Sequence, residues 1–273
     1  MGRPVDVDGI ATNLHDRGDG PPVLLLHGSG PGVSAWANWR GTFDALADRY
    51  RVVAPDIVGF GYTQRPVGFR YELDAWTAHL VGVLDALELP RVSVVGNSFG
   101  GALALALAAE HPERVNRVVL MGAVGMRTSI SPGLEQVWST TADRAEMEAT
   151  MRLFAHDPSR LTPDLINLRT AAAARPEADQ AWRVMFGPPR QARLDALAQP
   201  DEVLRTVPQE FLLLHGREDQ VIPVEWSVRL SHLLPRNDLH VFGRCGHWVQ
   251  IEAAKRFVRL VSDFLAPASG PAG

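Results

Sequence analysis

The sequence predicts an α/β fold in which a mostly parallel sheet is covered by helices on both faces. Short apolar segments alternate along the chain with longer segments of helical periodicity. The apolar segments are continuous rather than alternating, which is typical of parallel strands buried on both faces. A strand–helix–strand order with such strands requires right-handed crossover connections. The chain has 273 residues, 46% of them hydrophobic, which is enough to form a large core.

The individual elements follow from these patterns in chain order. The expected strands are Val23–His27, Arg51–Ala54, Arg91–Val95, Arg117–Met121, Glu210–Leu214 and Leu239–Phe242. The expected helices cover about Trp36–Ala47, Leu73–Leu87 and Phe99–Glu110. The third helix consists mainly of Ala and Leu, so we expect it to be buried on most sides.

The alternation of strands and helices stops after about residue 125 and resumes near residue 207. Between these points the sequence has helical patterns, many Met, Phe and Trp residues, and no convincing strand. We interpret residues 126–206 as a helical lid over the C-terminal edge of the sheet, and residues 1–125 with 207–273 as the core domain. The alternative is a series of ordinary core helices, but an insertion between two sheet strands favours a lid.

Composition argues against several classes of partner and indicates no cofactor. The net charge is −4 and there is no basic patch, so nucleic acid and anionic membranes are not expected partners. No apolar run approaches the roughly 18 residues of a membrane-spanning helix, and no residues have metal-ligand spacing. The single cysteine, Cys245, leaves no intrachain disulfide and fits a reducing cytoplasm. The turn-rich tail Pro267–Gly273 is expected to fray.

The strongest catalytic motif is Gly96–Gly101 (GNSFGG), which follows an expected strand and begins an expected helix. It matches the G-x-S-x-G nucleophile elbow in the required strand–turn–helix context. The turn is so sharp that its serine is strained, and neighbours without Cβ avoid clashes between strand and helix. Ser98 would then project at the helix N-terminus, where amide dipoles favour negative charge. A glycine-rich turn with a helix-capping serine is the alternative, and the combined context favours the nucleophile.

A serine hydroxyl needs a base to remove its proton, and an imidazole suits this task. Among the nine histidines, His247 stands out because its loop follows an expected strand and precedes the last helix. In this architecture such a loop faces the elbow. His27 is more typical of a structural residue, and His111 of a solvated helix end. The remaining histidines have no special context: His15, His79, His156, His215, His232 and His240.

The base in turn needs a carboxylate that fixes its tautomer and stabilises its cation. Asp219 comes directly after the strand that ends near residue 215, and its neighbour Glu218 is the competitor. The chain order Ser98, Asp219, His247 is the order of the triad in α/β-hydrolases. The joint placement of these residues predicts a serine-nucleophile hydrolase with the α/β-hydrolase fold.

The glycine-rich segment His27–Gly32 follows the first central strand and is a variant of the HGGG-type loop that supplies an oxyanion donor. The expected donors are the backbone N–H groups of Ser29 and Phe99. Such a donor typically contributes about 3 kcal/mol in the transition state. A phosphate-binding loop is the alternative for this segment, but no Gly-Lys-Ser/Thr follows, so we discard it.

At these residues the chain resembles the meta-cleavage product hydrolases, and the resemblance runs along nearly the whole chain. These α/β-hydrolases break a carbon–carbon bond in vinylogous 1,5-diketones that ring-cleaving dioxygenases make. The most specific segments are His27–Trp39, Asp56–Gly61, Gly96–Gly101 and Val241–Trp248. The most similar branch is the monocyclic one, which contains the 2-hydroxymuconate-semialdehyde hydrolases. Generic esterases share the elbow and the triad, whereas the Gly-Pro-Gly loop with Asn38 and the Cys-Gly-His-Trp segment are more particular.

The resemblance implies roles that the residues alone do not assign. It places Asp219 rather than Glu218 in the triad. It also implies substrate-binding roles for four residues, Asn38, Asn97, Arg169 and Trp248. The family places an arginine at the position of Arg169, in the lid, where it binds the carboxylate or oxo group of the substrate. An anionic dienol acid does need a cation, and the guanidinium fork matches a carboxylate.

The resemblance also implies an activity. The expected reaction converts 2-hydroxymuconate semialdehyde, or a 6-alkyl ring-fission product, into 2-hydroxypenta-2,4-dienoate and a carboxylic acid, in a homodimer or larger homo-oligomer without a cofactor. Biphenyl-type members have Gly in place of Ser29 and often Met in place of Phe99, which favours the monocyclic branch. The alternatives are a carboxylesterase with the same triad and a ligand-binding module that has lost catalysis.

Overall fold

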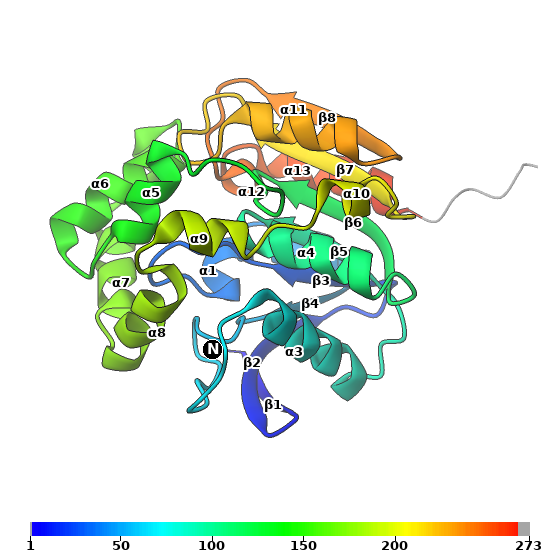
Figure 1. The fold of residues 1–273 in the computed structure, drawn as a ribbon, viewed down its shortest axis with the longest axis horizontal. Helices are drawn as coiled ribbons and strands as arrows, with labels where there is room; N and C mark the ends of the chain where they lie inside the picture. Colours follow the sequence, from blue (N-terminus) through cyan, green and yellow to red (C-terminus); the bar gives the residue numbers. More distant parts are fainter. Residues whose placement is uncertain (1, 267–273) are drawn as a thin grey trace, which may run out of the picture.

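The computed structural model describes residues 2–266 and contains an eight-stranded sheet in the order β1-β2-β4-β3-β5-β6-β7-β8 (Figure 1). The strands are β1 Arg3–Val7, β2 Ile10–Arg17, β3 Pro22–Leu26, β4 Arg51–Pro55, β5 Val92–Asn97, β6 Val115–Met121, β7 Glu210–Gly216 and β8 Asn237–Phe242. From β3 and β4 through β8, neighbouring strands are parallel. The α/β prediction is confirmed, and each of the six expected strands overlaps an observed one.

The sequence patterns missed β1 and β2, which form an antiparallel hairpin at one edge of the sheet. Their connecting turn contains Asp8 and Gly9, both with positive φ (50° and 82°). An Asp-Gly pair between two strands is a strong hairpin signal, so the information was present in the sequence. Both strands are partly solvated, and β1 is exposed along most of its length, so neither has a continuous apolar run.

The core helices are α1 Ala35–Trp39, α2 Phe43–Ala47, α3 Leu73–Ala86, α4 Phe99–Glu110, α11 Val224–Leu233, α12 Val249–Glu252 and α13 Ala254–Leu265. The expected helices for α3 and α4 are confirmed, and α4 has the expected bounds and is buried from Phe99 to Ala108. The single helix expected over Trp36–Ala47 is wrong, because α1 and α2 are separate. Gly41 lies between them, and glycine has a low helix propensity.

Successive residues of β3 point to opposite faces of the sheet, and each face has its own apolar core. Leu24 and Leu26 pack into a core with residues of α3, α4 and α11. Val23 and Leu25 pack into a second core with residues of α1, α2 and α13. This two-sided burial is the reason why the central strands are continuously apolar in the sequence.

A series of helices connects β6 to β7: α5 Pro132–Ser139, α6 Arg144–Phe154, α7 Pro163–Ala173, α8 Pro176–Phe186, α9 Arg190–Asp195 and α10 Asp201–Leu204, with a 3₁₀ turn at Pro158–Arg160. Proline in the first turn of α5, α7 and α8 fixes where these helices begin. In Figure 1, α5 to α8 lie together beyond one end of the sheet. In the described part of this connection the β-structure is limited to one isolated bridge, between Met126 and Gln199.

No helix within residues 2–266 is long and apolar enough to cross a membrane. The prediction of a frayed tail concerns residues 267–273, which lie outside the described residues.

Candidate active site

Ser98 lies on the sharp turn between β5 and α4, where the elbow motif predicts it. Its φ of 53° and ψ of −113° place a non-glycine residue in a sparsely populated backbone region. The Ser98 amide donates a hydrogen bond of 2.8 Å to the carbonyl of Met121 in β6. A Cβ on Gly96 would collide with the backbone of Gly100, so strand and helix approach this closely only because no side chain intervenes. The surrounding packing therefore maintains the strained turn.

The imidazole of His247 is paired with Asp219. Nδ1 of His247 lies 2.7 Å from Oδ2 of Asp219, and both side chains are buried. Oδ1 of Asp219 accepts hydrogen bonds from the amides of Val221 (2.8 Å) and Ile222 (2.9 Å), so the carboxylate is fixed from two sides. Burial opposes ionisation of Asp219, but the neighbouring histidines outweigh it and hold its pKa well below the usual range. Asp219 can thus orient His247 through Nδ1 and leave Nε2 available as a base.

Glu218, the competing carboxylate, bonds to other groups. Its Oε1 accepts a hydrogen bond of 2.8 Å from Arg217, and its Oε2 accepts one of 2.9 Å from the amide of Cys245. The Cys245 amide and the Arg217 guanidinium lower the pKa of Glu218. Glu218 therefore anchors the loop that carries His247 rather than the imidazole itself.

Ser98 and His247 line the same cavity. Within residues 2–266 no hydrogen bond joins the serine hydroxyl to the imidazole. Such contacts are often long in free enzymes and shorten when substrate binds. Gly122 follows β6 with a φ of 46°, and a Cβ there would lie 3.0 Å from Nδ1 of His247 and 3.1 Å from Oδ2 of Asp219. The His–Asp pair is therefore closely packed against the backbone after β6.

His215 contacts Asp219, although nothing in its sequence context singles it out. It is fully buried at the end of β7, and its Nε2 lies 2.9 Å from the carbonyl oxygen of Ile222 and 3.3 Å from Oδ2 of Asp219. Both partners can only accept, so Nε2 carries a proton. Nδ1 lies 2.6 Å from the hydroxyl of Ser227, which donates to it when the ring is neutral. The available sequence signal is only its place four residues before Asp219.

His27 fixes the glycine-rich loop after β3, which confirms its structural role. Its Nδ1 donates to the carbonyl of Gly28 at 2.8 Å, and its Nε2 accepts from the amide of Ile57 at 3.0 Å. These two bonds require the neutral ring. Complete burial lowers the pKa of His27, which favours the same form.

Of the two expected oxyanion donors, Ser29 lines the same cavity as Ser98, and Phe99 directly follows Ser98 in the chain. Ser29 is on the loop after β3, and Phe99 is the first residue of α4, where a backbone N–H has no partner within the helix. Both residues are buried. The hydroxyl of Ser29 accepts a hydrogen bond of 3.0 Å from Nε1 of Trp138 in α5, which ties this loop to the inserted helices. The sequence did not single out Trp138.

The inserted helices place a positively charged side chain in the same cavity. Arg169 of α7 is 6% exposed, and its Nη1 is buried without a hydrogen-bond partner. Burial and then the charge of Arg40 lower its pKa to about 10, so it stays protonated at neutral pH. Asn38 also lines the cavity, and its Nδ2 is buried and unpaired. Asn97 does so too, with Nδ2 donating a 3.3 Å bond to a carbonyl of β6. Buried donors without partners indicate that this end accommodates an anion.

Comparisons with known proteins identify the family. A sequence model of the alpha/beta hydrolase fold matches residues 21–254. The chain is 54% identical to 2-hydroxy-6-oxo-2,4-heptadienoate hydrolase of Pseudomonas putida, over 97% of this chain and 96% of that protein. It is 50% identical to 2-hydroxymuconate semialdehyde hydrolase of a Pseudomonas species, over 100% and 96%. A solved meta-cleavage product hydrolase from Pseudomonas fluorescens superposes with a TM-score of 0.95 at 50% identity, covering 97% of each chain. The chain belongs to the meta-cleavage product hydrolases.

The cavity of this meta-cleavage product hydrolase has a polar part and an apolar part. The space between its lining atoms is about 320 Å³, part of it open to solvent. The apolar lining consists of Val33, Leu134, Val137, Phe154, Val221 and Trp248. Trp248 stacks on Phe154 of α6, with ring centroids 5.1 Å apart and planes 9° apart. Phe154 also lies over His247 at 5.6 Å. Trp248 therefore reaches the cavity, and its partner Phe154 is a residue that sequence reasoning missed.

Glu252 of α12 links the loop of His247 to the inserted helices of this hydrolase. Its carboxylate accepts hydrogen bonds from the backbone amides of Gly246 (2.7 Å), His156 (3.2 Å) and Asp157 (2.8 Å). Gly246 precedes His247, whereas the other two residues follow α6. One side chain thus sets the spacing between the base and the apolar wall, and no motif indicates it.

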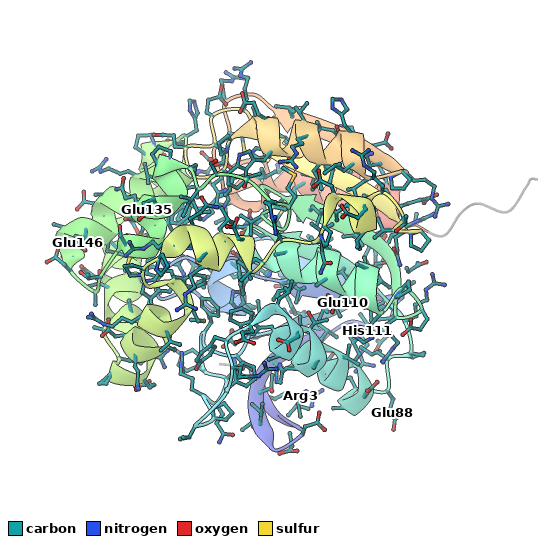
Figure 2. All side chains as sticks on the ribbon, in the orientation of Figure 1. Arg3, Glu88, Glu110, His111, Glu135 and Glu146 are labelled. Carbon is teal, nitrogen blue, oxygen red and sulfur yellow. The ribbon has the colours of Figure 1, made fainter. Side chains whose placement is uncertain are left out.

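Two other histidines lie away from the site. His111 lies at the opposite end of α4 from Ser98 (Figure 2), as expected for a solvated helix end. His79 of α3 is buried against the hydroxyl of Thr12 at 2.9 Å. Burial lowers the pKa of His79 to about 4, so this ring is neutral in the folded protein near neutral pH.

Proposed function

We propose that the protein hydrolyses a carbon–carbon bond of 2-hydroxymuconate semialdehyde or of a 6-alkyl-6-oxo-2,4-dienoate ring-fission product. The products would be 2-hydroxypenta-2,4-dienoate and a carboxylic acid, as in degradation of aromatic compounds by meta-cleavage. The observation that carries the proposal is the unpartnered, buried guanidinium of Arg169 in the cavity that also contains Ser98 and His247. The relatives named for these substrates support the same substrate class.

Binding places the substrate anion at the polar end of the cavity. The carboxylate and the adjacent oxygen approach Arg169, Asn38 and Asn97, which present otherwise unused or weakly bonded donors. A guanidinium suits a carboxylate because the two match as a bidentate pair. With that end fixed, the dienol tautomerises to a keto form, which creates an electron-accepting group adjacent to the bond that breaks.

Ser98 is the proposed nucleophile, His247 its base and Asp219 the residue that orients the base. As the Ser98 oxygen attacks the aldehyde or ketone carbon, its proton passes to His247, and the amides of Ser29 and Phe99 stabilise the oxyanion. When the oxyanion collapses, the electron pair of the carbon–carbon bond enters the dienoate fragment, which takes a proton. Water then hydrolyses the acyl-serine, with His247 as base, and releases formate from the semialdehyde or a longer acid from an alkyl ketone.

Residues 126–206 act in this proposal as the lid, and 1–125 with 207–273 as the core. Trp138, Phe154 and Arg169 come from the inserted helices and contact or line the site, which supports this division. Apolar side chains from the lid and Trp248 would exclude water and surround the substituent on the scissile carbon. We extend the proposal to a cytoplasmic homodimer or larger homo-oligomer, on the strength of the resemblance.

The test compares kcat/KM on the yellow ring-fission product of catechol, followed by its loss of absorbance, with kcat/KM on p-nitrophenyl acetate. We expect the dienoate to be the better substrate by orders of magnitude. A carboxylesterase would show the reverse preference, and it would have no use for a buried cation opposite a neutral ester. Ring-fission products of 3-methylcatechol and 2,3-dihydroxybiphenyl, assayed in the same way, would define the substituent that fits.

A further inference from the structure

The catalytic groups are closed off from solvent. Ser98 is 4% exposed, His247 is 3% exposed and Arg169 is 6% exposed. A dienoate cannot reach them from bulk water unless part of the surrounding wall moves. The thin part of that wall therefore indicates the direction from which substrate arrives.

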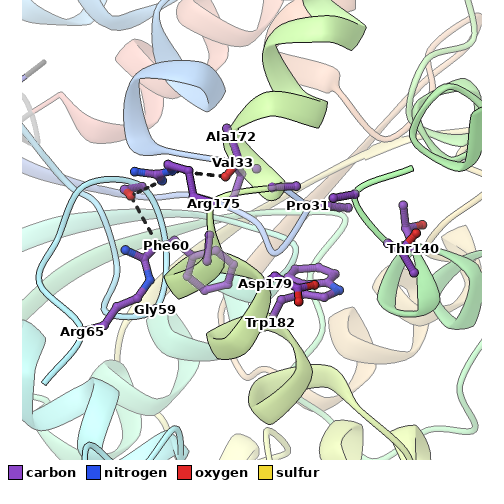
Figure 3. Close-up of a pocket in the computed structure, with 16 residues that line it drawn as sticks. Pro31, Val33, Gly59, Phe60, Arg65, Thr140, Ala172, Arg175, Asp179 and Trp182 are labelled. Atoms are coloured by element: carbon purple, nitrogen blue, oxygen red, sulfur yellow. Dashed lines mark hydrogen bonds between the residues drawn. The ribbon is translucent and has the colours of Figure 1, made fainter. Parts of the chain in front are cut away.

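A second cavity lies directly against the catalytic one. The space between its lining atoms is about 400 Å³, part of it open to solvent, and Val33 lines both cavities. Pro31 and Gly32, which line the second cavity, continue the loop whose preceding glycines line the first. In α7, Arg169 lines the catalytic cavity, whereas Ala172 and Ala173, one turn later, line the second. Ala172 is labelled at the second cavity in Figure 3. The wall between them thus consists of the Val33 side chain, one loop and one helical turn.

Two guanidinium groups line one end of the second cavity. Nη2 of Arg175 donates a 2.7 Å hydrogen bond to the carbonyl of Gly61, and Nη2 of Arg65 donates one of 3.3 Å to the same oxygen (Figure 3). Nε of Arg65 is buried without a partner, and so is Nε1 of Trp182, which also lines the cavity. Burial lowers the pKa of Arg65. The cavity thus offers unused donors and positive charge.

Acidic groups nearby offset this charge only partly. Asp179 lines the cavity, but its carboxylate lies 2.9 Å from the guanidinium of Arg183. Glu177 lies 3.7 Å from Arg175, and both groups are partly solvent-exposed, so their attraction is weak. The remaining lining is mostly apolar, with Val33, Phe60, Ala173 and Ala178 among its residues. A flat conjugated acid, with one anionic end and an apolar body, matches such a lining.

We propose that this second cavity is an approach site, in which the anionic substrate binds before it passes Val33 to reach Arg169 and Ser98. The charge of the ligand rests on the proposed function. The net charge of the chain is −4, so the molecule as a whole repels such an anion, and a local pair of cations would counteract this repulsion. The substrate then moves from Arg65 and Arg175 to a third guanidinium, Arg169.

The route can be blocked in the folded enzyme. Ala178 of α8 lines the second cavity but not the catalytic one. In an Ala178→Cys variant, benzyl methanethiosulfonate would attach a benzyl group by a disulfide, and dithiothreitol would remove it. The natural Cys245 is 1% exposed, and burial raises its pKa to about 12, so it should not react. We expect labelling to lower kcat/KM at least about tenfold on both p-nitrophenyl acetate and the dienoate, and reduction to restore it.

The matched control is Ala171→Cys, because Ala171 is exposed on α7 and lines neither cavity. Its labelling should leave both activities unchanged. If the Ala178→Cys variant does not fold, Ala173→Cys provides the same test from α7. Complete labelling, verified by mass spectrometry, with unchanged kcat/KM on both substrates would overturn the proposal. The neutral ester keeps this test separate from the proposed function: if the wild-type enzyme does not cleave the dienoate, the ester still reports whether the route is blocked.

The role of charge is tested with Arg65→Gln. We expect kcat/KM on the dienoate to fall severalfold at low ionic strength and to differ little from wild type at about 0.5 M salt, where the Debye length is only a few ångströms. Ester hydrolysis should be unaffected, and Arg65→Lys should restore most of the loss. Arg205→Gln, which removes an exposed charge from the end of α10, is the control. An equal loss on both substrates would assign Arg65 to structure alone and contradict its role in attracting the anion.

Discussion

The ends of the parallel strands and the helices inserted between β6 and β7 contribute different things to one cavity. Ser98 follows β5, Asp219 follows β7 and His247 follows β8, so the sheet positions the three proposed catalytic groups. Arg169 and Phe154 come from α7 and α6, so the inserted helices provide groups suited to select the substrate. The proposed catalytic residues are thus held by the rigid sheet. The proposed recognition residues lie on helices that can vary in sequence without disturbing the sheet.

Ser98→Ala should give the largest effect. The effect should fall on the chemical step rather than on substrate binding. We expect kcat on the dienoate to fall by about 10⁴-fold or more, because no other group in the proposed mechanism attacks the carbon. Binding should persist, since the Arg169 end of the cavity is unchanged. Stopped-flow absorbance of the enzyme–dienoate complex measures both quantities. Turnover close to that of wild type would remove Ser98 from the mechanism.

Arg169→Ala should act on recognition. We expect kcat/KM on the dienoate to fall by about 100-fold, which corresponds to about 2.7 kcal/mol, a magnitude typical of charged hydrogen bonds. Hydrolysis of p-nitrophenyl acetate should change little, because that ester has no carboxylate. Arg169→Lys keeps the charge but not the planar fork, so it should recover only part of the loss. Equal losses on dienoate and ester would mean that Arg169 supports the fold of α7 rather than the substrate.

The same division explains what could be predicted from the sequence. The elbow, the central strands and α4 could be predicted because parallel strands and sharp turns impose local residue requirements, such as the glycines beside Ser98. The role of Arg169 came only from family resemblance. A buried cation at the site depends on how α7 packs on the loop containing Gly30, and no local pattern in the sequence encodes that contact.

Two kinds of feature escaped prediction for physical reasons. The β1–β2 hairpin lacks a continuous apolar run because it lies at a solvated edge, and only the Asp8-Gly9 turn signals it. His215 contacts Asp219, four residues later, in a geometry that only the end of β7 creates, and Glu252 accepts hydrogen bonds from backbone amides that are distant in the chain. Such contacts can be identified only in the folded structure. A histidine inside a strand sequence otherwise resembles any buried polar residue.

His215→Leu tests whether the proposed catalytic groups depend on their neighbours, because it removes a donor to Asp219 without changing Ser98 or His247. We expect kcat to fall about tenfold, from the loss of roughly 1–2 kcal/mol of hydrogen bonding to a charged group. The pKa of Asp219 should rise, because the hydrogen bond and charge of His215 help to lower it. His215→Gln, which can keep a donor near the position of Nε2, should recover activity. A loss of stability with unchanged kcat in both variants would make His215 structural only.

His79→Gln should give the smallest effect. It tests whether the stability of the core domain can change without a change in catalysis. Burial lowers the pKa of His79 from 6.5 to about 4, so between these values the unfolded chain binds a proton that the folded chain does not. The stability contributed by the neutral His79 ring is therefore fully present above pH 6.5 and decreases as the pH falls toward 4. We expect the free energy of unfolding to drop by about 1 kcal/mol more in wild type than in His79→Gln between pH 8 and 5.5. Urea unfolding at both pH values measures the difference, and kcat at pH 8 should be the same in the two proteins because the ring contacts Thr12 rather than the cavity. Parallel stability curves for the two proteins would show that folding does not lower the pKa of His79. A lower kcat in the variant would show that stability and catalysis are coupled across the sheet.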